Sequence, residues 1–379
     1  MKQHLNEEAA MLINQKIEFN GVKGIQHLTL ELSNEKMNVL IGSNGVGKTK
    51  ALESLYTLLL LTNNAIQGRY ISNDAFVFQQ CKINNNSIFN INNYGTEVRY
   101  MLSEHIEKHD FPVIYLAAQN RGEIKSLENQ GIHPLGEYQE RQTAYFKHIL
   151  GAMSNSFSTL NMNNNIEEWF IQRAQSANDY QAEADNREVE LLTVLRILNK
   201  IDPRISADKR DFKIIGGKSV SIMLDGQARR LNELSSGFAS LIKIVQSIVA
   251  GYGFFTNADE IENVQGYVLI DEIESHLHIQ WQSKILPLLQ QAFPNTYFII
   301  STHSSLVLAQ LHHGNAYQLV KNNEDVFTQP IANPSKMALI DLLNDAFDVN
   351  LNQLKIDNAN PESQQKAKNA LLSLLGGEE

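Results

Sequence analysis

The sequence contains only one cysteine, Cys81, among its 379 residues. A single thiol excludes an internal disulfide framework and fits a reducing compartment. The first eight residues lack the apolar core of a signal peptide, and no stretch approaches the roughly 18 consecutive apolar residues of a membrane span. We therefore expect a cytoplasmic protein with no membrane partner.

An excess of basic charge is also absent. The chain has 32 Lys and Arg residues against 42 Asp and Glu residues, a net charge of −10, so it lacks the overall basic field that attracts nucleic acid. Its most basic stretch, residues 204–230, also contains Asp208, Asp211 and Asp225. We interpret that stretch as a solvated surface of mixed charge rather than as a DNA-contact patch.

A complete phosphate-binding loop of the form G-x-x-x-x-G-K-[ST] is present. It consists of Gly42, Ser43, Asn44, Gly45, Val46, Gly47, Lys48 and Thr49. The apolar run at 37–41 predicts a buried strand before the loop, and helical spacing of apolar residues predicts a helix from 48 to about 61. In that context the loop N–H groups and the helix N-terminus bind an anion. Lys48 can then reach the β- and γ-phosphates, while Thr49 can ligate Mg²⁺, so the sequence predicts a site for a nucleoside triphosphate.

Two adjacent carboxylates, Asp271 and Glu272, follow a second apolar strand at 266–270. Beside a phosphate loop, Asp271 can hold Mg²⁺ through water and Glu272 can polarise the attacking water. Taken alone, an acidic pair after a strand is equally consistent with a helix N-cap. The phosphate loop upstream favours the catalytic interpretation.

Two further polar residues follow strands. Residues 297–303 form an apolar run that ends at His303, which we expect to touch the γ-phosphate as a second catalytic residue. A lone histidine after a strand is more often a surface residue. The position of His303, about 30 residues after the acidic pair, favours a catalytic role instead. Gln119 follows a predicted strand at 111–117 and is a candidate for sensing the metal.

A small turn at 234–238 precedes a predicted helix at 239–250. It contains Ser235 and Gly237, and such a turn opening a helix is again a terminus that can bind an anion. The turn and the phosphate loop cannot serve the same phosphates if each binds from a helix end on a separate lobe.

The order of these four motifs resembles the ATP-binding-cassette (ABC) ATPase superfamily, over residues from about 15 to 320. Such heads usually bind two ATP molecules between two antiparallel copies. The resemblance therefore implies a homodimer or higher homo-oligomer in which Ser235 and Gly237 cap the γ-phosphate bound by Lys48 of the other copy. The sequence departs from the family at Ser236, where most relatives carry Gly, and at Phe238, where they carry Gln or Glu.

Within the superfamily, the chain most resembles the heads related to the OLD (overcoming lysogenization defect), RecF and structural-maintenance-of-chromosomes (SMC) groups. Residues 19–25 resemble their opening strand and turn, and residues 271–278 resemble the acidic segment of OLD-like ATPases. Many of these proteins act in bacterial defence against phage. The resemblance implies a separate effector partner, either a nuclease or a toxin.

We expect an α/β fold of ABC type, with a mixed sheet, an N-terminal β-hairpin or antiparallel layer, and a helical insertion. The hairpin is predicted from strand-like segments at 16–19 and 25–32 that flank two glycines. The expected parts are a discontinuous ATPase domain at 1–121 and 205–330, a mostly helical insertion at 122–204, and a C-terminal helical extension at 331–379.

Three functions compete with a partner-controlling ATPase. A transporter subunit is disfavoured because about 187 residues separate Lys48 from Ser235, more than a compact transporter head needs. A fused nuclease is disfavoured because no Asp-x-Asp pair follows His303. A DNA-repair or recombination head that binds DNA directly stays open. We expect an enzyme that converts ATP and water to ADP and phosphate and acts as a dimerising switch in anti-phage defence.

Overall fold

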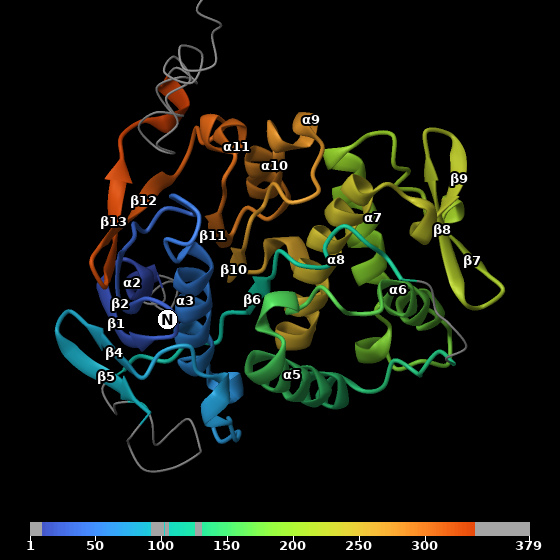
Figure 1. The fold of residues 1–379 in the computed structure, drawn as a ribbon. Coiled ribbons are helices and arrows are strands. Elements are labelled where there is room, and N and C mark those ends of the chain that lie inside the picture. The colour runs from blue at the N-terminus through green and yellow to red at the C-terminus, as the bar shows by residue number, and fades with distance from the viewer. Residues whose placement is uncertain (1–9, 92–101, 103–105, 126–130, 338–379) are drawn as a thin grey trace, which may run out of the picture.

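The computed structural model describes residues 10–91, 102, 106–125 and 131–337. Its centre is a ten-stranded sheet with the order β5-β4-β1-β2-β13-β12-β3-β11-β10-β6 (Figure 1). The strands of this sheet are β1 (Lys16–Val22), β2 (Gln26–Glu31), β3 (Met37–Ile41), β4 (Gln80–Ile83), β5 (Asn86–Asn90), β6 (Val113–Leu116), β10 (Gly266–Ile270), β11 (Thr296–Ser301), β12 (Asn315–Asn322) and β13 (Asp325–Ile331).

The half of the sheet that carries the predicted motifs is parallel. Strand β3 pairs in parallel with β11 and β12, and β10 pairs in parallel with β11 and β6. Every residue of β3, β6, β10 and β11 is buried, as expected for strands covered on both faces. Because the carboxyl ends of parallel strands meet at one edge, the segments that follow β3, β6, β10 and β11 lie together there.

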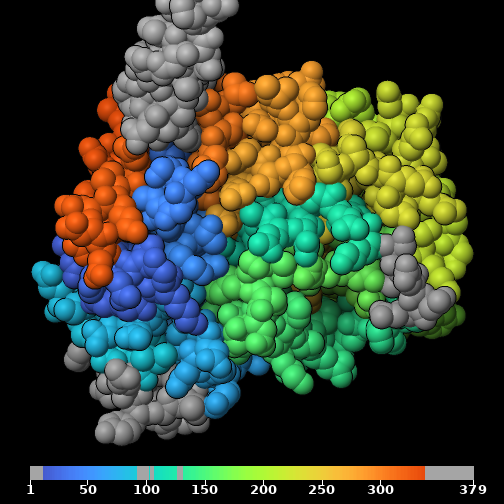
Figure 2. Space-filling view, in the orientation of Figure 1, coloured from blue at the N-terminus to red at the C-terminus, as the bar shows by residue number. Residues whose placement is uncertain are grey.

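The other half of the sheet is largely antiparallel. The predicted hairpin of β1 and β2 is confirmed, and β4 and β5 extend it from the asparagine-rich region where no strand was predicted. The antiparallel hairpin of β12 and β13, also missed, joins the two halves because β12 pairs with β3 and β13 pairs with β2. Figure 2 shows this layer and the small sheet at opposite ends of the visible face.

Helices cover both faces of the sheet. They are α2 (Ala10–Ile13), α3 (Lys48–Leu61), α5 (Tyr138–Asn155), α6 (Ile166–Gln175), α7 (Glu188–Ile201), α8 (Ser236–Thr256), α9 (Ile279–Gln282), α10 (Ile285–Ala292) and α11 (Ser305–Ala309). Helix α3 follows the phosphate loop as predicted. Segment 122–204, the predicted helical insertion, contains α5, α6 and α7. Residues 338–379, most of the predicted C-terminal extension, lie outside the described residues.

Helix α8 corrects one expectation. Among the described residues it is the one helix long and apolar enough to cross a membrane, with a mean hydropathy of 1.5 in its most apolar window. The expectation that no stretch approaches a span was therefore wrong in length and composition. However, 89% of that window is buried inside the protein, and Figure 1 shows α8 between α7 and the strands β6 and β10.

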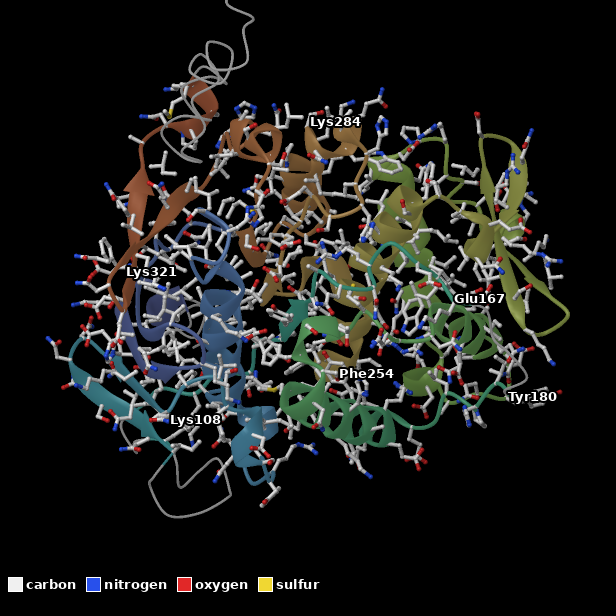
Figure 3. All side chains as sticks on the ribbon, viewed as in Figure 1. Lys108, Glu167, Tyr180, Phe254, Lys284 and Lys321 are labelled. Atoms are coloured by element: carbon white, nitrogen blue, oxygen red, sulfur yellow. The ribbon has the colours of Figure 1, made fainter. Side chains whose placement is uncertain are left out.

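A second, three-stranded antiparallel sheet lies at the edge of the molecule, with β8 (Ser219–Leu224) between β7 (Lys213–Ile215) and β9 (Gln227–Arg230). Glu167 on α6, labelled in Figure 3, accepts a hydrogen bond from the Val220 N–H at 3.2 Å. This bond ties the small sheet to the helical layer.

Candidate nucleotide site

The phosphate loop lies between β3 and α3, in a backbone conformation that requires glycine. Gly42 has φ +147°, and a Cβ atom there would lie 3.0 Å from the Leu319 carbonyl oxygen. Gly47 has φ +109°, and a Cβ atom there would lie 3.0 Å from Ile25 Cδ1. The hairpin turn and β12 therefore pack so closely against the loop that larger residues would displace it.

Lys48 folds back over this loop. Its Nζ donates hydrogen bonds to the carbonyl oxygens of Gly42 at 2.8 Å and Ser43 at 3.0 Å. Burial lowers the pKa of Lys48 from 10.5 to about 8, although Asp271 and Glu272 act to raise it. An ammonium group that is hydrogen-bonded to two neutral carbonyl groups is stabilised much less than one that lies beside a phosphate group.

Thr49 and Asp271 meet, although they are 222 residues apart. Thr49 Oγ1 donates a hydrogen bond to Asp271 Oδ2 at 2.9 Å, and Ser301 Oγ donates one to Asp271 Oδ1 at 2.6 Å. Burial raises the pKa of Asp271, and these two hydrogen bonds oppose the shift. The hydroxyl and the carboxylate form an all-oxygen pair of the kind that binds Mg²⁺ together with phosphate and water.

No group of three or more His, Cys, Asp or Glu side chains in the described part of the chain could hold a metal ion. A magnesium ion at this site would therefore depend on Thr49, Asp271, water and the phosphates of a bound nucleotide. That sparse protein contribution suits Mg²⁺, which usually keeps several waters.

Glu272 follows directly and is half-buried. Its N–H donates to Ser301 Oγ at 2.8 Å, and its Oε2 accepts a hydrogen bond from Ser275 Oγ at 3.0 Å. Its φ of +44° lies in the left-handed region, which is strained for a residue with a side chain and persists only where the surroundings impose it.

His303 lies on the next strand end, and Glu274 holds its main chain. The Glu274 carboxylate accepts hydrogen bonds from the His303 N–H and from Thr302 Oγ1, both at 2.6 Å. Glu274 and Ser301 were not singled out in the sequence, although both lie within predicted motifs. Gln119 lies in an exposed turn after β6, and its side chain forms no hydrogen bond with any described residue.

The predicted turn before α8 lies at the helix N-terminus. Ser235 is the N-cap residue of α8 and is exposed. Gly237 is buried, and a Cβ atom there would lie 2.9 Å from the Trp281 ring. Phe238, the residue that departs from the family pattern, packs edge-on against Trp281 at 4.7 Å between ring centroids. Among the described residues, neither Ser235 nor Gly237 forms a hydrogen bond to the phosphate loop.

Comparisons with known proteins show similarity to an AAA domain and to a probable ATPase. Residues 200–309 match a family profile described as "AAA domain, putative AbiEii toxin, Type IV TA system". The chain is 24% identical to "Retron Vc95 probable ATPase" of Vibrio cholerae serotype O1 biovar El Tor, over 80% of this chain and 74% of that protein. It is 26% identical to "Septu protein PtuA" of Bacillus thuringiensis, over 78% of this chain and 72% of that protein.

A solved SMC head, bound to the C-terminal winged-helix domain of ScpA, aligns with 83% of this chain and 96% of that chain. The TM-score is 0.45 at 13% identity, and a TM-score below 0.5 adds no weight. The motif order, the mixed sheet with its antiparallel layer, and the curated relatives support an ABC-superfamily ATPase. Within that class, the relatives of this chain are the retron and Septu proteins of defence systems.

Proposed function

We propose that the protein hydrolyses ATP to ADP and phosphate with Mg²⁺. The observation that carries this proposal is the 2.9 Å hydrogen bond between Thr49 and Asp271, which joins the phosphate loop to the acidic strand end. The name of one relative, a probable ATPase, supports it. Glu272, one residue beyond Asp271, is the proposed general base.

Each residue has a distinct task in this proposal. Lys48 leaves the carbonyl groups of Gly42 and Ser43 and binds the β- and γ-phosphates, where its charge is compensated. Thr49 and Asp271 hold Mg²⁺, which neutralises negative charge on the phosphate oxygens when bound. Glu272 orients the attacking water and accepts its proton. His303 contacts the γ-phosphate, and Gln119 senses the metal.

We further propose that two copies close around ATP. Ser235 and Gly237 then cap the γ-phosphate held by Lys48 of the other copy, so that ATP joins the copies and hydrolysis releases them. The exposed N-cap residue Ser235 supports this arrangement, because the first N–H groups of a helix have no partner within the helix and can bind a phosphate. The switch would control a separate nuclease or toxin in anti-phage defence, as the retron and Septu relatives suggest.

The substitution Glu272→Gln tests this mechanism. It removes the base but keeps the size of the side chain, so ATP binding should persist while hydrolysis slows by roughly 10²-fold or more. With Mg·ATP the variant should accumulate as a closed dimer or larger form, measured by light scattering. The wild type measured with ADP is the control. If Glu272→Gln hydrolyses ATP at the wild-type rate, the proposed base is wrong.

One observation favours a second candidate function, a head that binds nucleic acid directly. All seven Lys and Arg residues within 204–230 are exposed, whereas Asp225 is the one exposed aspartate of that stretch. Arg204 and Arg210 pair with aspartates, but Lys213 and Arg230 form no ion pair with any described residue. These two side chains flank Ser221 across the small sheet, so the surface is more basic than the sequence suggested.

The substitutions Lys213→Glu and Arg230→Glu, made together, test this candidate. Binding of labelled single- and double-stranded DNA and RNA would be followed by fluorescence anisotropy over a range of salt. Lost phosphate contacts should lower affinity and flatten the salt dependence by about one unit per contact. Lys321→Glu, at the opposite end of the molecule in Figure 3, is the control for a charge reversal away from this surface; it changes the net charge by about half as much as the double variant. Equal binding by all three proteins would exclude this surface.

A further inference from the structure

Arg121 is a fully buried arginine directly below the candidate site. It lies in the turn that follows β6, two residues after Gln119. Arg121 lies outside the phosphate loop and the acidic pair, so neither motif predicts a role for it. Its position links the ends of β6 and β10, the two strands that carry Gln119 and the acidic pair.

The guanidinium group binds only main-chain carbonyl groups. Its Nη1 donates to the Glu272 carbonyl oxygen at 2.8 Å. Its Nη2 lies 2.6 Å from the Ala117 oxygen, 2.7 Å from the Asp271 oxygen and 3.2 Å from the Leu116 oxygen. The planar fork of arginine spans these acceptors in a fixed geometry, which the single ammonium group of lysine cannot reproduce.

This arrangement is costly. Moving a cation out of water is strongly unfavourable unless it is paired, and Arg121 forms no ion pair with any described carboxylate. Burial lowers the pKa of Arg121 to about 10, although nearby Asp271 and Glu274 act to raise it. Ordinary packing of two strand ends does not require a buried charge. A neighbouring group that needs the hydrogen bonds of Arg121 would account for it.

The strained main chain of Glu272 is such a group. Its left-handed φ of +44° is costly, by about 1 to 3 kcal/mol for such strained positions in general. Ser301 binds its N–H at 2.8 Å, and Arg121 binds its carbonyl oxygen from the other side. The two contacts together fix the peptide groups on both sides of Glu272 and so aim its carboxylate.

We propose that Arg121 is a positioning residue for ATP hydrolysis. Its guanidinium group holds the main chain of Asp271 and Glu272 so that the Glu272 carboxylate meets the attacking water. This inference rests on the proposed function. Arg121 contacts neither the phosphate loop nor Thr49 in the described structure, so its role concerns hydrolysis and not nucleotide binding.

The substitution Arg121→Lys keeps the charge and loses the fork, whereas Arg121→Gln keeps one donor group and loses the charge. In both variants we expect kcat for ATP hydrolysis to fall by roughly 10²-fold, the scale of a misplaced catalytic group. The KM for ATP and the affinity measured by calorimetry should change less than about threefold, because the phosphate loop is untouched.

A double-mutant cycle separates positioning from general stabilisation. If Arg121 acts through Glu272, then adding Arg121→Lys to Glu272→Gln should reduce single-turnover hydrolysis little further. If the two losses multiply, Arg121 acts by another route and the proposal is overturned.

Arg187 provides a matched control. It is also buried and donates to two main-chain carbonyl oxygens, those of Asn257 and Ala258, but it lies in the helical layer and pairs with Glu190. Arg187→Lys should lower the free energy of unfolding and leave kcat near the wild-type value. A folded Arg121→Lys variant with wild-type kcat would overturn the proposal. A wild-type protein without ATPase activity would overturn the proposed function and this inference with it.

Should both Arg121 variants fail to fold, Gly122→Ala decides the question. A Cβ atom at position 122 would lie 2.6 Å from His276 Cγ, so the turn of Arg121 and the exposed His276 side chain cannot both keep their present positions. We expect the same loss of kcat with ATP affinity retained. A folded Gly122→Ala variant with wild-type kcat would overturn the positioning role.

Discussion

Lys48 lies in an environment that stabilises its charged form less than water does. Two carbonyl oxygens accept its hydrogen bonds, and burial lowers its pKa to about 8. It is also the one lysine of the phosphate loop. Lys48→Ala should therefore abolish ATP binding, measured by calorimetry. Unchanged affinity in this variant would contradict the assignment of the loop.

The lowered pKa of Lys48 predicts that the affinity for ATP depends on pH. Bound phosphates favour the charged form, so ATP binding near pH 9 should take up most of one proton at Lys48. The apparent affinity should then fall as pH rises above about 8, by up to roughly tenfold per unit. Calorimetry in two buffers of different ionisation enthalpy measures the uptake. Lys48→Arg, which stays charged, should not show it, and equal uptake in both proteins would contradict the prediction.

Residues inside motifs could be predicted from sequence because their chemistry depends on local spacing. The structure brings Thr49 and Asp271 into contact, as two ligands of one Mg²⁺ ion require. Arg121 could not be predicted, because its partners are main-chain carbonyl groups that leave no side-chain pattern. Their positions depend on which strands are neighbours, and only the folded sheet determines that.

At the scale of elements, the N-terminus of α8 is the part of the proposed composite site that forms no hydrogen bond to its own phosphate loop in the described structure. The Phe238 and Trp281 rings fix it to α9, which follows the Glu272 segment. A shift of α8 on closure would therefore act on the catalytic side of the same chain. This contact also accounts for an aromatic residue at the position where the ABC superfamily pattern has Gln or Glu.

Ser235→Arg tests the composite site. A bulky cation there should spare ATP binding at Lys48 but block closure and hydrolysis. Mixing this variant with Lys48→Ala leaves each heterodimer with one site carrying both lesions and one carrying neither. The intact site should recover part of the hydrolysis, measured as phosphate release against each variant alone.

Recovery would be hard to explain if Ser235 acted within its own subunit, since every subunit in the mixture is defective. Strict cooperativity between two sites would prevent recovery even in a composite arrangement. In that case a cross-link from position 235 to an ATP analogue bound by a Lys48-containing partner subunit decides. If the analogue is cross-linked only within one subunit, the composite arrangement is wrong.

At the scale of the molecule, the central sheet is completed by strands that are distant from one another in the sequence. Gly314, just before β12, has φ +118°, and a Cβ atom there would lie 2.3 Å from the Met37 carbonyl oxygen at the start of β3. Gly314→Ala should therefore lower the free energy of unfolding through both strain and steric conflict, by more than about 2 kcal/mol.

Gly216→Ala is the control for backbone strain alone, because Gly216 has φ +59° and a Cβ atom added there would have no neighbour within 4 Å. It should cost about 1 kcal/mol. Urea unfolding of the two variants measures the difference. An equal cost would show that β12 does not depend on close approach to β3.

The parallel core could be predicted from its continuous apolar runs, and the first hairpin from its alternation and glycines. The hairpin of β12 and β13 was missed because its strands are only partly buried, with mixed polar and apolar residues. Strands β4 and β5 were missed for a similar reason, since asparagines dominate their surroundings. Pairing with neighbours, rather than local preference, stabilises these four strands.

The position of β3 has a consequence for synthesis on the ribosome. Both neighbours of this strand, β11 and β12, come from residues 296–322, more than 250 positions later in the chain. Until they emerge, the phosphate loop has no sheet to hold it, and β2 and β3 expose unpaired edges. Pairings of such long separation form slowly and leave partly made chains prone to aggregation. A nascent chain can therefore complete the proposed nucleotide site only after residues 296–322 have left the ribosome, which makes ATP binding a marker of an assembled sheet.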